Sequence, residues 1–136
     1  MKLSRTVAYA LQATLQLAQS GNQNPVPCSR LAAEGKMPER FLLQILRNLV
    51  AHGILSSTRG VDGGYTLDRA PEEISLLEII EAIEGPITPV IPVSPGLLAV
   101  SKAKLEEALA SITEAARKDL QAIKLAHLLP SPRRVK

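Results

Sequence analysis

The stretch MPERFLLQILRNLVAHGILSSTRGVDGGYTL (residues 37–67) changes its hydrophobic period halfway along. In its first part, apolar residues recur three and four apart, the spacing of a helix with one buried face. Pro38 suits the first turn of this helix, and His52–Gly53 ends it. The residues expected on the buried face are Phe41, Leu42, Ile45, Leu46, Leu49 and Val50.

The second part of the same stretch predicts a β-hairpin. Residues 54–58 and 65–67 are expected to form its two strands, and residues 59–64 its turn. Gly63 and Gly64 tolerate positive φ, as tight hairpin turns require. The stretch as a whole therefore predicts a helix followed directly by a hairpin.

Two further helices are expected before this stretch. Residues 3–19 have helical periodicity with Ser4 as a candidate N-cap. Pro25 and Pro27 interrupt regular helix, and a short helix fits residues 29–34. The order of helix, short helix, longer helix and hairpin is that of a winged helix-turn-helix.

After the hairpin, Pro71-Glu72-Glu73 is expected to open a helix that ends at Gly85-Pro86. A proline-rich linker (86–96) leads to a helical segment (97–128) with an apolar stripe, followed by a flexible tail (129–136). We therefore expect a mainly α fold with a small β-hairpin, comprising a winged-helix domain (1–85) and a long C-terminal dimerisation helix.

Composition narrows the class of protein further. The 136 residues are 46% hydrophobic but only 2% aromatic, which favours helix packing through aliphatic side chains. The formal net charge is +4 over residues 1–70 and −1 over residues 71–136, so the basic surplus lies in the first half. With no transmembrane-length apolar run and no secretory signal, we expect a cytoplasmic protein.

The predicted third helix has an outer face suited to reading DNA bases. Arginine, glutamine and asparagine side chains can make paired hydrogen bonds to base edges in the major groove. At the hairpin, Arg59 lies beside glycines that allow close approach to DNA, although Asp62 opposes this reading. The alternatives are an ordinary polar helix surface and an ordinary turn. The outward residues of the helix are Glu39, Arg40, Leu43, Gln44, Arg47 and Asn48.

The motifs along residues 1–86 resemble, in order and spacing, the Rrf2 family of bacterial transcriptional regulators. The resemblance implies a dimer whose long C-terminal helices pack together and present two winged helices to a palindromic operator. We expect a repressor with no catalytic activity. The motifs are Met1-Lys2-Leu3-Ser4, Tyr9-Ala10, Pro25-Val26, Leu31-Ala32, residues 37–46, Gly53-Ile54-Leu55, Arg59-Gly60, Gly63-Gly64-Tyr65 and Ile83-Glu84-Gly85-Pro86.

The same resemblance implies which residues contact DNA. Leu43 departs from the acidic residue of the iron–sulfur cluster regulator, so that regulator's operator sequence does not transfer to this chain. The implied contacts are Phe41 and Gln44 in the recognition helix, Arg59 and Gly60 at the wing, and Lys2 and Arg5 near the N-terminus.

The segment expected to sense a signal also departs from the family. Cluster-binding members carry three cysteines between the fourth helix and the dimerisation helix, whereas residues 87–100 contain none. Thiolates are the ligands of iron–sulfur clusters, so we expect no cluster, cofactor or metal. Cys28, the only cysteine, is either a redox sensor at a helix N-terminus or a small buried hydrophobe. A small molecule or a protein is then the expected effector.

Two other classes of function compete with DNA binding. The chain could instead be a protein-interaction module that retains the fold and docks on a metabolic enzyme through the long helix or the proline-rich loop. An enzymatic function has little support, since the sequence shows no nucleophile–base pair, phosphate-binding glycine loop or metal-ligand cluster.

Overall fold

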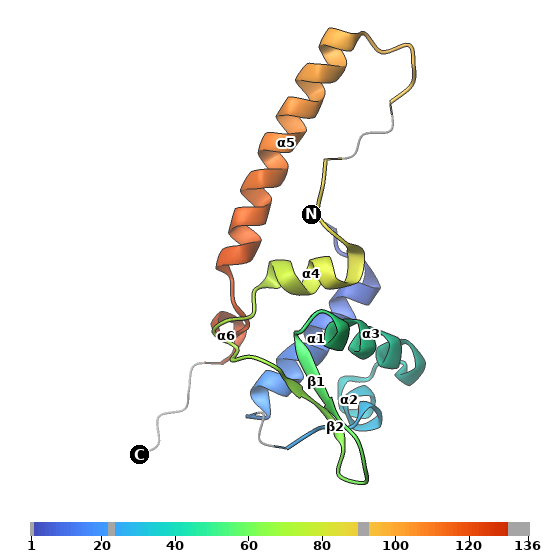
Figure 1. Cartoon of the computed structure of the whole chain (residues 1–136), viewed down its shortest axis with the longest axis vertical. Helices are drawn as coiled ribbons and strands as arrows, with labels where there is room; N and C mark the ends of the chain where they lie inside the picture. The colour runs from blue at the N-terminus through green and yellow to red at the C-terminus, as the bar shows by residue number, and fades with distance from the viewer. Residues whose placement is uncertain (1, 22–23, 90–92, 131–136) are drawn as a thin grey trace.

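The computed structural model describes residues 2–21, 24–89 and 93–130. It has a mainly helical fold with a two-stranded antiparallel hairpin, which confirms the predicted fold class (Figure 1). The elements are α1 (Arg5–Gln19), α2 (Cys28–Gly35), α3 (Glu39–Ala51), β1 (Leu55–Thr58), β2 (Gly64–Leu67), α4 (Leu76–Glu84), α5 (Ala99–Ala122) and α6 (Leu125–Leu128).

The hydrophobic core lies between the first four helices and the base of the hairpin. The stripe on α3 is buried as predicted at four positions, and Val50 is half-buried against the core. The four buried residues are Leu42, Ile45, Leu46 and Leu49. Phe41 is an exception, because 68% of its surface is exposed. The first turn of α3 faces the start of α1 across an open hollow, so this ring remains outside the core.

Two helix starts illustrate how local hydrogen bonds set boundaries. Ser4 caps α1 as predicted, since its hydroxyl accepts from the backbone N–H of Val7 at 3.2 Å. The predicted start of α4 at residues 71–73 is wrong, because these residues form a turn and the helix begins at Leu76. Ser75 and Glu78 form a reciprocal capping box that fixes the later start.

The hairpin pairs Leu55 with Leu67 through to Thr58 with Gly64. Val26 adds an isolated bridge to Tyr65, and a Cβ on Gly64 would lie 2.4 Å from the backbone of Val26, so only glycine fits. Gly64 has a positive φ of +151° as expected. Gly63 does not have a positive φ, which corrects that prediction; it is required because a Cβ would lie 2.2 Å from the carbonyl oxygen of Thr58.

The C-terminal segment is not one continuous helix over residues 97–128. It consists of α5 and the short α6, separated at Ile123 and Lys124 (Figure 1). At this break the chain returns to the core: Leu76 donates to the carbonyl of Ile123 and Leu125 donates to that of Ile74, each at 2.9 Å. These bonds tie the end of α5 to the start of α4.

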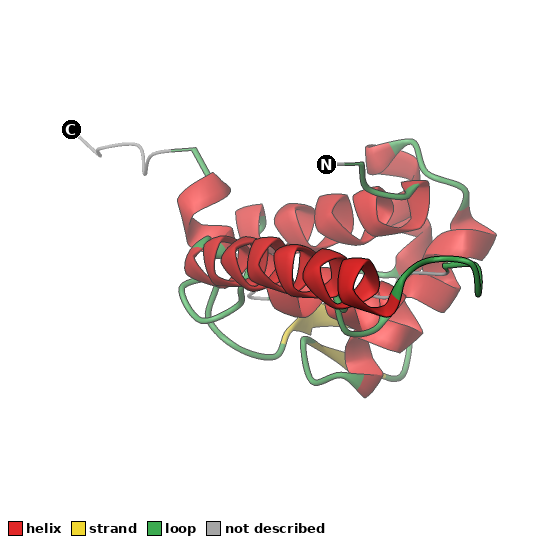
Figure 2. Cartoon of the chain, turned by 90° about the horizontal axis from the view of Figure 1, so that it is seen from above, coloured by secondary structure: helices red, strands yellow, loops and turns green. Residues whose placement is uncertain are grey.

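Beyond its contact with α4, helix α5 projects away from the other helices (Figure 1), and in the view from above it lies in front of them (Figure 2). None of its residues is buried in the single chain. The described part of the predicted linker (86–96) contains no helix or strand, and its residues 90–92 lie outside the described chain, as do residues 131–136 of the predicted tail.

Candidate nucleic-acid interface

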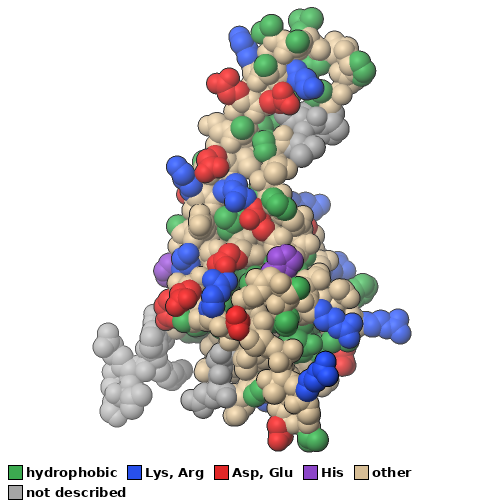
Figure 3. Space-filling view, viewed as in Figure 1, with side chains coloured by type: hydrophobic (Ala, Val, Ile, Leu, Met, Phe, Trp, Pro, Cys, Tyr) green, Lys and Arg blue, Asp and Glu red, His purple; other side chains and the backbone are tan. Residues whose placement is uncertain are grey.

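The outer face of α3 carries exposed cations. Arg40 and Arg47 are both exposed, and within the described residues neither forms an ion pair, unlike Arg30, Arg69 and Arg117. Space-filling Figure 3 shows basic side chains projecting where α3 and the hairpin form one edge of the molecule. Unpaired cations on one edge are available to a polyanion.

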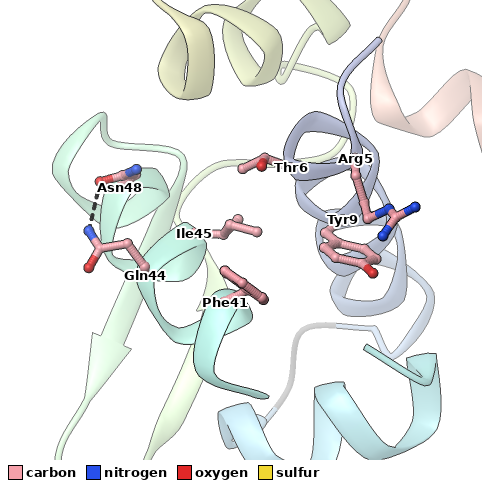
Figure 4. A pocket seen from close by; sticks show the side chains of 7 residues that line it. All are labelled: Arg5, Thr6, Tyr9, Phe41, Gln44, Ile45 and Asn48. Atoms are coloured by element: carbon pink, nitrogen blue, oxygen red, sulfur yellow. Dashed lines mark hydrogen bonds between the residues drawn. The ribbon is translucent and has the colours of Figure 1, made fainter. Parts of the chain in front are cut away.

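Two amide side chains lie together on the same helix. Gln44, which is exposed, donates from Nε2 to Oδ1 of the half-buried Asn48 at 3.4 Å (Figure 4). The pair is one helical turn apart, the spacing at which side chains meet on a helix surface. The contact orients the Gln44 amide while leaving its oxygen and its second N–H free for another partner.

A hollow of about 250 Å³ lies between the start of α1 and the start of α3. Figure 4 shows Phe41 and Ile45 pointing from α3 toward α1, whereas Gln44 and Asn48 lie on the side of α3 away from α1. The hollow thus brings together four residues predicted from sequence as DNA contacts. Its lining is Arg5, Thr6, Tyr9, Phe41, Gln44, Ile45 and Asn48.

On the α1 side of this hollow, sequence reasoning named Arg5 as a DNA contact but missed Thr6 and Tyr9. Tyr9 lies one turn after Arg5, so both occur on the same face of α1 and line the hollow with Thr6. The i, i+4 spacing of an arginine and a tyrosine was a usable signal, but only the position of α3 shows what they face. Lys2 is exposed just before α1.

The remaining predicted contacts lie at the tip of the hairpin. Arg59 and Gly60 are exposed, and Gly60 has a φ of +107° with open space beside it. The Gly60 carbonyl accepts from the N–H of Gly63 at 3.0 Å, closing a turn with Val61 and Asp62 at its centre. Both central side chains are exposed, so the tip presents cationic, apolar and anionic groups together.

Cys28 is half-buried in the first turn of α2. Its Sγ lies 3.8 Å from the carbonyl oxygen of Glu39. Burial raises the pKa of the thiol, and the nearby negative charge of Glu39 raises it further. The thiolate is the nucleophilic form of cysteine, so this environment disfavours the redox chemistry that the sequence left open.

Three helices followed by a two-stranded hairpin, with the third helix facing outward, define a winged helix-turn-helix. The chain belongs to the Rrf2 family: the family pattern, described as an iron-dependent transcriptional regulator, matches residues 3–131. Its relatives are transcriptional regulators and not enzymes. No described helix is long and apolar enough to cross a membrane.

Individual relatives agree with this membership. A Mycobacterium tuberculosis protein, provisionally named a helix-turn-helix transcriptional regulator, is 37% identical over 101 residues, 74% of this chain and 63% of its own length. The structure of CymR, the global cysteine regulator of Bacillus subtilis, superposes with a TM-score of 0.77 at 29% identity, covering 94% of this chain and 95% of CymR. The T. potens IscR structure has a TM-score of 0.73 at 28% identity, covering 100% and 93%.

This chain spans less than two thirds of the length of the curated relatives that it matches here. Moreover, the iron in the family description does not fit the residues present. Among the described residues, no group of three His, Cys, Asp or Glu side chains could hold a metal ion. The whole sequence has one cysteine, whose thiol is disfavoured as a thiolate, so a cluster held by cysteine thiolates does not fit within one chain.

Proposed function

We propose that this chain is a transcriptional repressor that binds a palindromic operator as a homodimer without an iron–sulfur cluster. The observation that carries the proposal is the outer face of α3, where two arginines without ion-pair partners among the described residues lie beside the Gln44–Asn48 amide pair. A helix of this kind offers charge to phosphates and paired hydrogen bonds to base edges.

Within this function, α3 and the wing have different tasks. Gln44 reads a base edge, supported by Asn48 as its positioning partner. Arg40 and Arg47 add contacts along the groove. Arg59 and Gly60 at the wing, with Lys2 and Arg5 at the start of the chain, contact the backbone or the narrow groove.

The dimer forms through α5. This helix has 24 residues, none of them buried in a single chain, and at 1.5 Å per residue it is about 36 Å long. Exposed apolar side chains lie on one face of it at Leu105 and Ile112, and the exposed Leu98 directly precedes its first turn. A second copy of the same helix covers such a face in a symmetric, self-complementary interface.

The signal reaches the regulator without a cluster, through a small molecule or a partner protein. The same apolar face of α5 also supports the second candidate function, a module that docks on a metabolic enzyme through α5 or the proline-rich loop. The two functions differ in a single test, since only the first requires sequence-specific and salt-dependent binding to DNA.

The experiment is a salt titration of binding to a selected operator and to a scrambled duplex, in EDTA and without added iron. Gln44→Ala is expected to cost about 1–3 kcal/mol on the operator and little on the scrambled duplex. Arg59→Ala is expected to weaken binding to both duplexes. It should also reduce the slope of log affinity against log salt concentration by about 2, because a dimer has two wings and each neutralised phosphate contributes roughly 0.9.

Matched controls come from α5, away from the proposed DNA interface. Gln121→Ala and Lys104→Ala remove an exposed amide and an exposed cation, and both are expected to bind as wild type does. Wild-type affinity and salt slope in both the Gln44 and Arg59 variants would show that these residues do not contact DNA. Absence of any operator preference in the wild-type protein would favour the interaction module.

A further inference from the structure

Phe41 is a large apolar side chain left outside the core. It is the only phenylalanine of the chain, and 68% of its surface is exposed. Two of the three aromatic side chains in the whole sequence, Tyr9 and Phe41, line the same hollow. In a protein with so few aromatics, an exposed aromatic beside an open apolar hollow indicates a surface that a partner covers.

The surroundings of the hollow show the chemistry of that partner. Ile45, which is buried, forms its apolar wall, and Figure 4 shows Phe41 beside it and facing α1. Arg5 is an exposed cation without an ion-pair partner among the described residues, and Gln44 adds an amide. The hollow therefore fits a partner that is anionic overall and apolar at one point.

DNA offers such a point in the major groove, where the C5-methyl group of thymine is apolar and marks that base. We propose that Phe41, at the mouth of this hollow, reads the methyl group of one thymine in each operator half-site. The inference rests on the proposed function and deepens it, because it assigns a base to a side chain that makes no hydrogen bonds.

The position of the thymine follows from the helix. Phe41 and Gln44 are three residues apart, so their side chains are about 5–6 Å apart on the surface of α3. Successive bases of one strand are about 3.4 Å apart along the duplex. The thymine read by Phe41 therefore lies within about two base steps of the base read by Gln44.

The test removes one methyl group at a time from the DNA. An operator is selected by the wild-type protein from random duplexes, and each thymine is replaced in turn by deoxyuridine, which pairs identically but lacks the methyl group. At one position, repeated by symmetry in each half-site, the wild-type protein is expected to bind about fourfold more weakly per half-site. This factor corresponds to the transfer free energy of one buried carbon. Losses at other thymines are expected to be smaller.

The second part of the test uses the variant Phe41→Ala, which removes an exposed ring and leaves the buried stripe of α3 intact. This variant is expected to bind the thymine operator more weakly and to show no further loss with deoxyuridine. Leu128→Ala, which removes a 45% exposed apolar side chain from α6, outside both proposed interfaces, is expected to retain the full deoxyuridine effect.

Three results would overturn the proposal, and they separate it from the proposed function. Indifference to deoxyuridine at every thymine, with operator preference intact, removes methyl reading but leaves DNA recognition standing. A deoxyuridine effect that persists in Phe41→Ala assigns the methyl to another residue. Failure of the wild-type protein to prefer any duplex contradicts the proposed function itself.

Discussion

Glu78 is a charged residue on which the start of α4 depends. One of its carboxylate oxygens accepts from Arg69 at 2.5 Å, and the other accepts from the backbone N–H of Ser75 at 3.0 Å. Partial burial acts to raise the pKa of this carboxyl group, but the hydrogen bonds from Arg69 and Ser75 outweigh burial, and the pKa falls below its ordinary value of 4.5. The ionised form therefore stabilises the folded state.

This shift predicts a pH dependence of stability. Because the folded pKa of Glu78 is depressed, its contribution is present above the ordinary value of 4.5 and is lost as the pH falls through the folded pKa. Glu78→Gln keeps a side chain able to close the capping box. We expect it to be less stable than wild type at pH 7, by no more than about 1 kcal/mol for so exposed a pair.

Urea unfolding of the two proteins from pH 7 to pH 3 measures this difference, which is expected to disappear toward pH 3. Glu84→Gln is the control, since Glu84 is exposed and has no hydrogen-bond or ion-pair partner within the described residues. A constant difference between wild type and Glu78→Gln across the pH range would contradict the role of the charge.

Single residues also mark what a sequence pattern can establish. Periodicity predicted the burial of Leu42 and Ile45 correctly but assigned Phe41 to the same face. Family resemblance assigned Phe41 to the outside, and the structure agrees with the resemblance about its exposure. A period describes which residues share a face of a helix, but not how far the neighbouring helices cover the first turn of that face.

At the scale of elements, α3 and the hairpin were predicted to within a few residues because the change of period and the glycines are local signals. The start of α4 and the break before α6 were not. The Ser75 cap competes with an equally plausible start at Pro71, and the break at Lys124 depends on a β-bridge to Ser75, far away in sequence. Long-range pairing of this kind leaves no periodic signal.

The contact between α6 and the core makes a prediction about Leu125. This side chain is fully buried with the core residues of α1, α3 and α4, although it lies beyond the projecting helix. Leu125→Ala is expected to lower the free energy of unfolding by about 2–5 kcal/mol. Leu128→Ala in the same short helix removes a side chain that is 45% exposed, and should cost less than about 1 kcal/mol.

Both variants are compared by urea unfolding at one protein concentration, because dimerisation would make stability depend on concentration. Equal stabilities of the Leu125 and Leu128 variants would mean that the C-terminal segment is not part of the winged-helix core. The larger loss at Leu125 would instead show that the core holds α5 at its C-terminal end.

For the molecule as a whole, the sequence predicted the fold class and a surface for DNA, but not how the parts are joined. The hollow between α1 and α3 is lined by residues of two helices more than thirty positions apart in sequence, and on α1 only Arg5 was predicted as a contact. Likewise, the apolar stripe of α5 was visible in the sequence, but the return of the chain into the core was not.

The last prediction concerns the assembly. Leu105 and Ile112 lie on one exposed apolar face of α5, and placing Asp at both is expected to yield monomers in light scattering, because two charges would have to be buried in the interface. Folding should survive, since no residue of α5 is buried in the single chain. Ala103→Asp is the control: it lies about 160° around the helix from Leu105 at 3.6 residues per turn, and should remain dimeric.

The same variants connect the assembly to DNA. A symmetric dimer binds two half-sites about 34–36 Å apart, or a multiple of that distance, so the monomeric double variant should lose most of its affinity for the whole operator while binding an isolated half-site as wild type does. Circular dichroism establishes that the monomer is folded. A double variant that stays dimeric would place the interface away from this face of α5. A folded monomer with undiminished operator affinity would show that the two half-sites are bound independently and that the dimer contributes nothing to recognition.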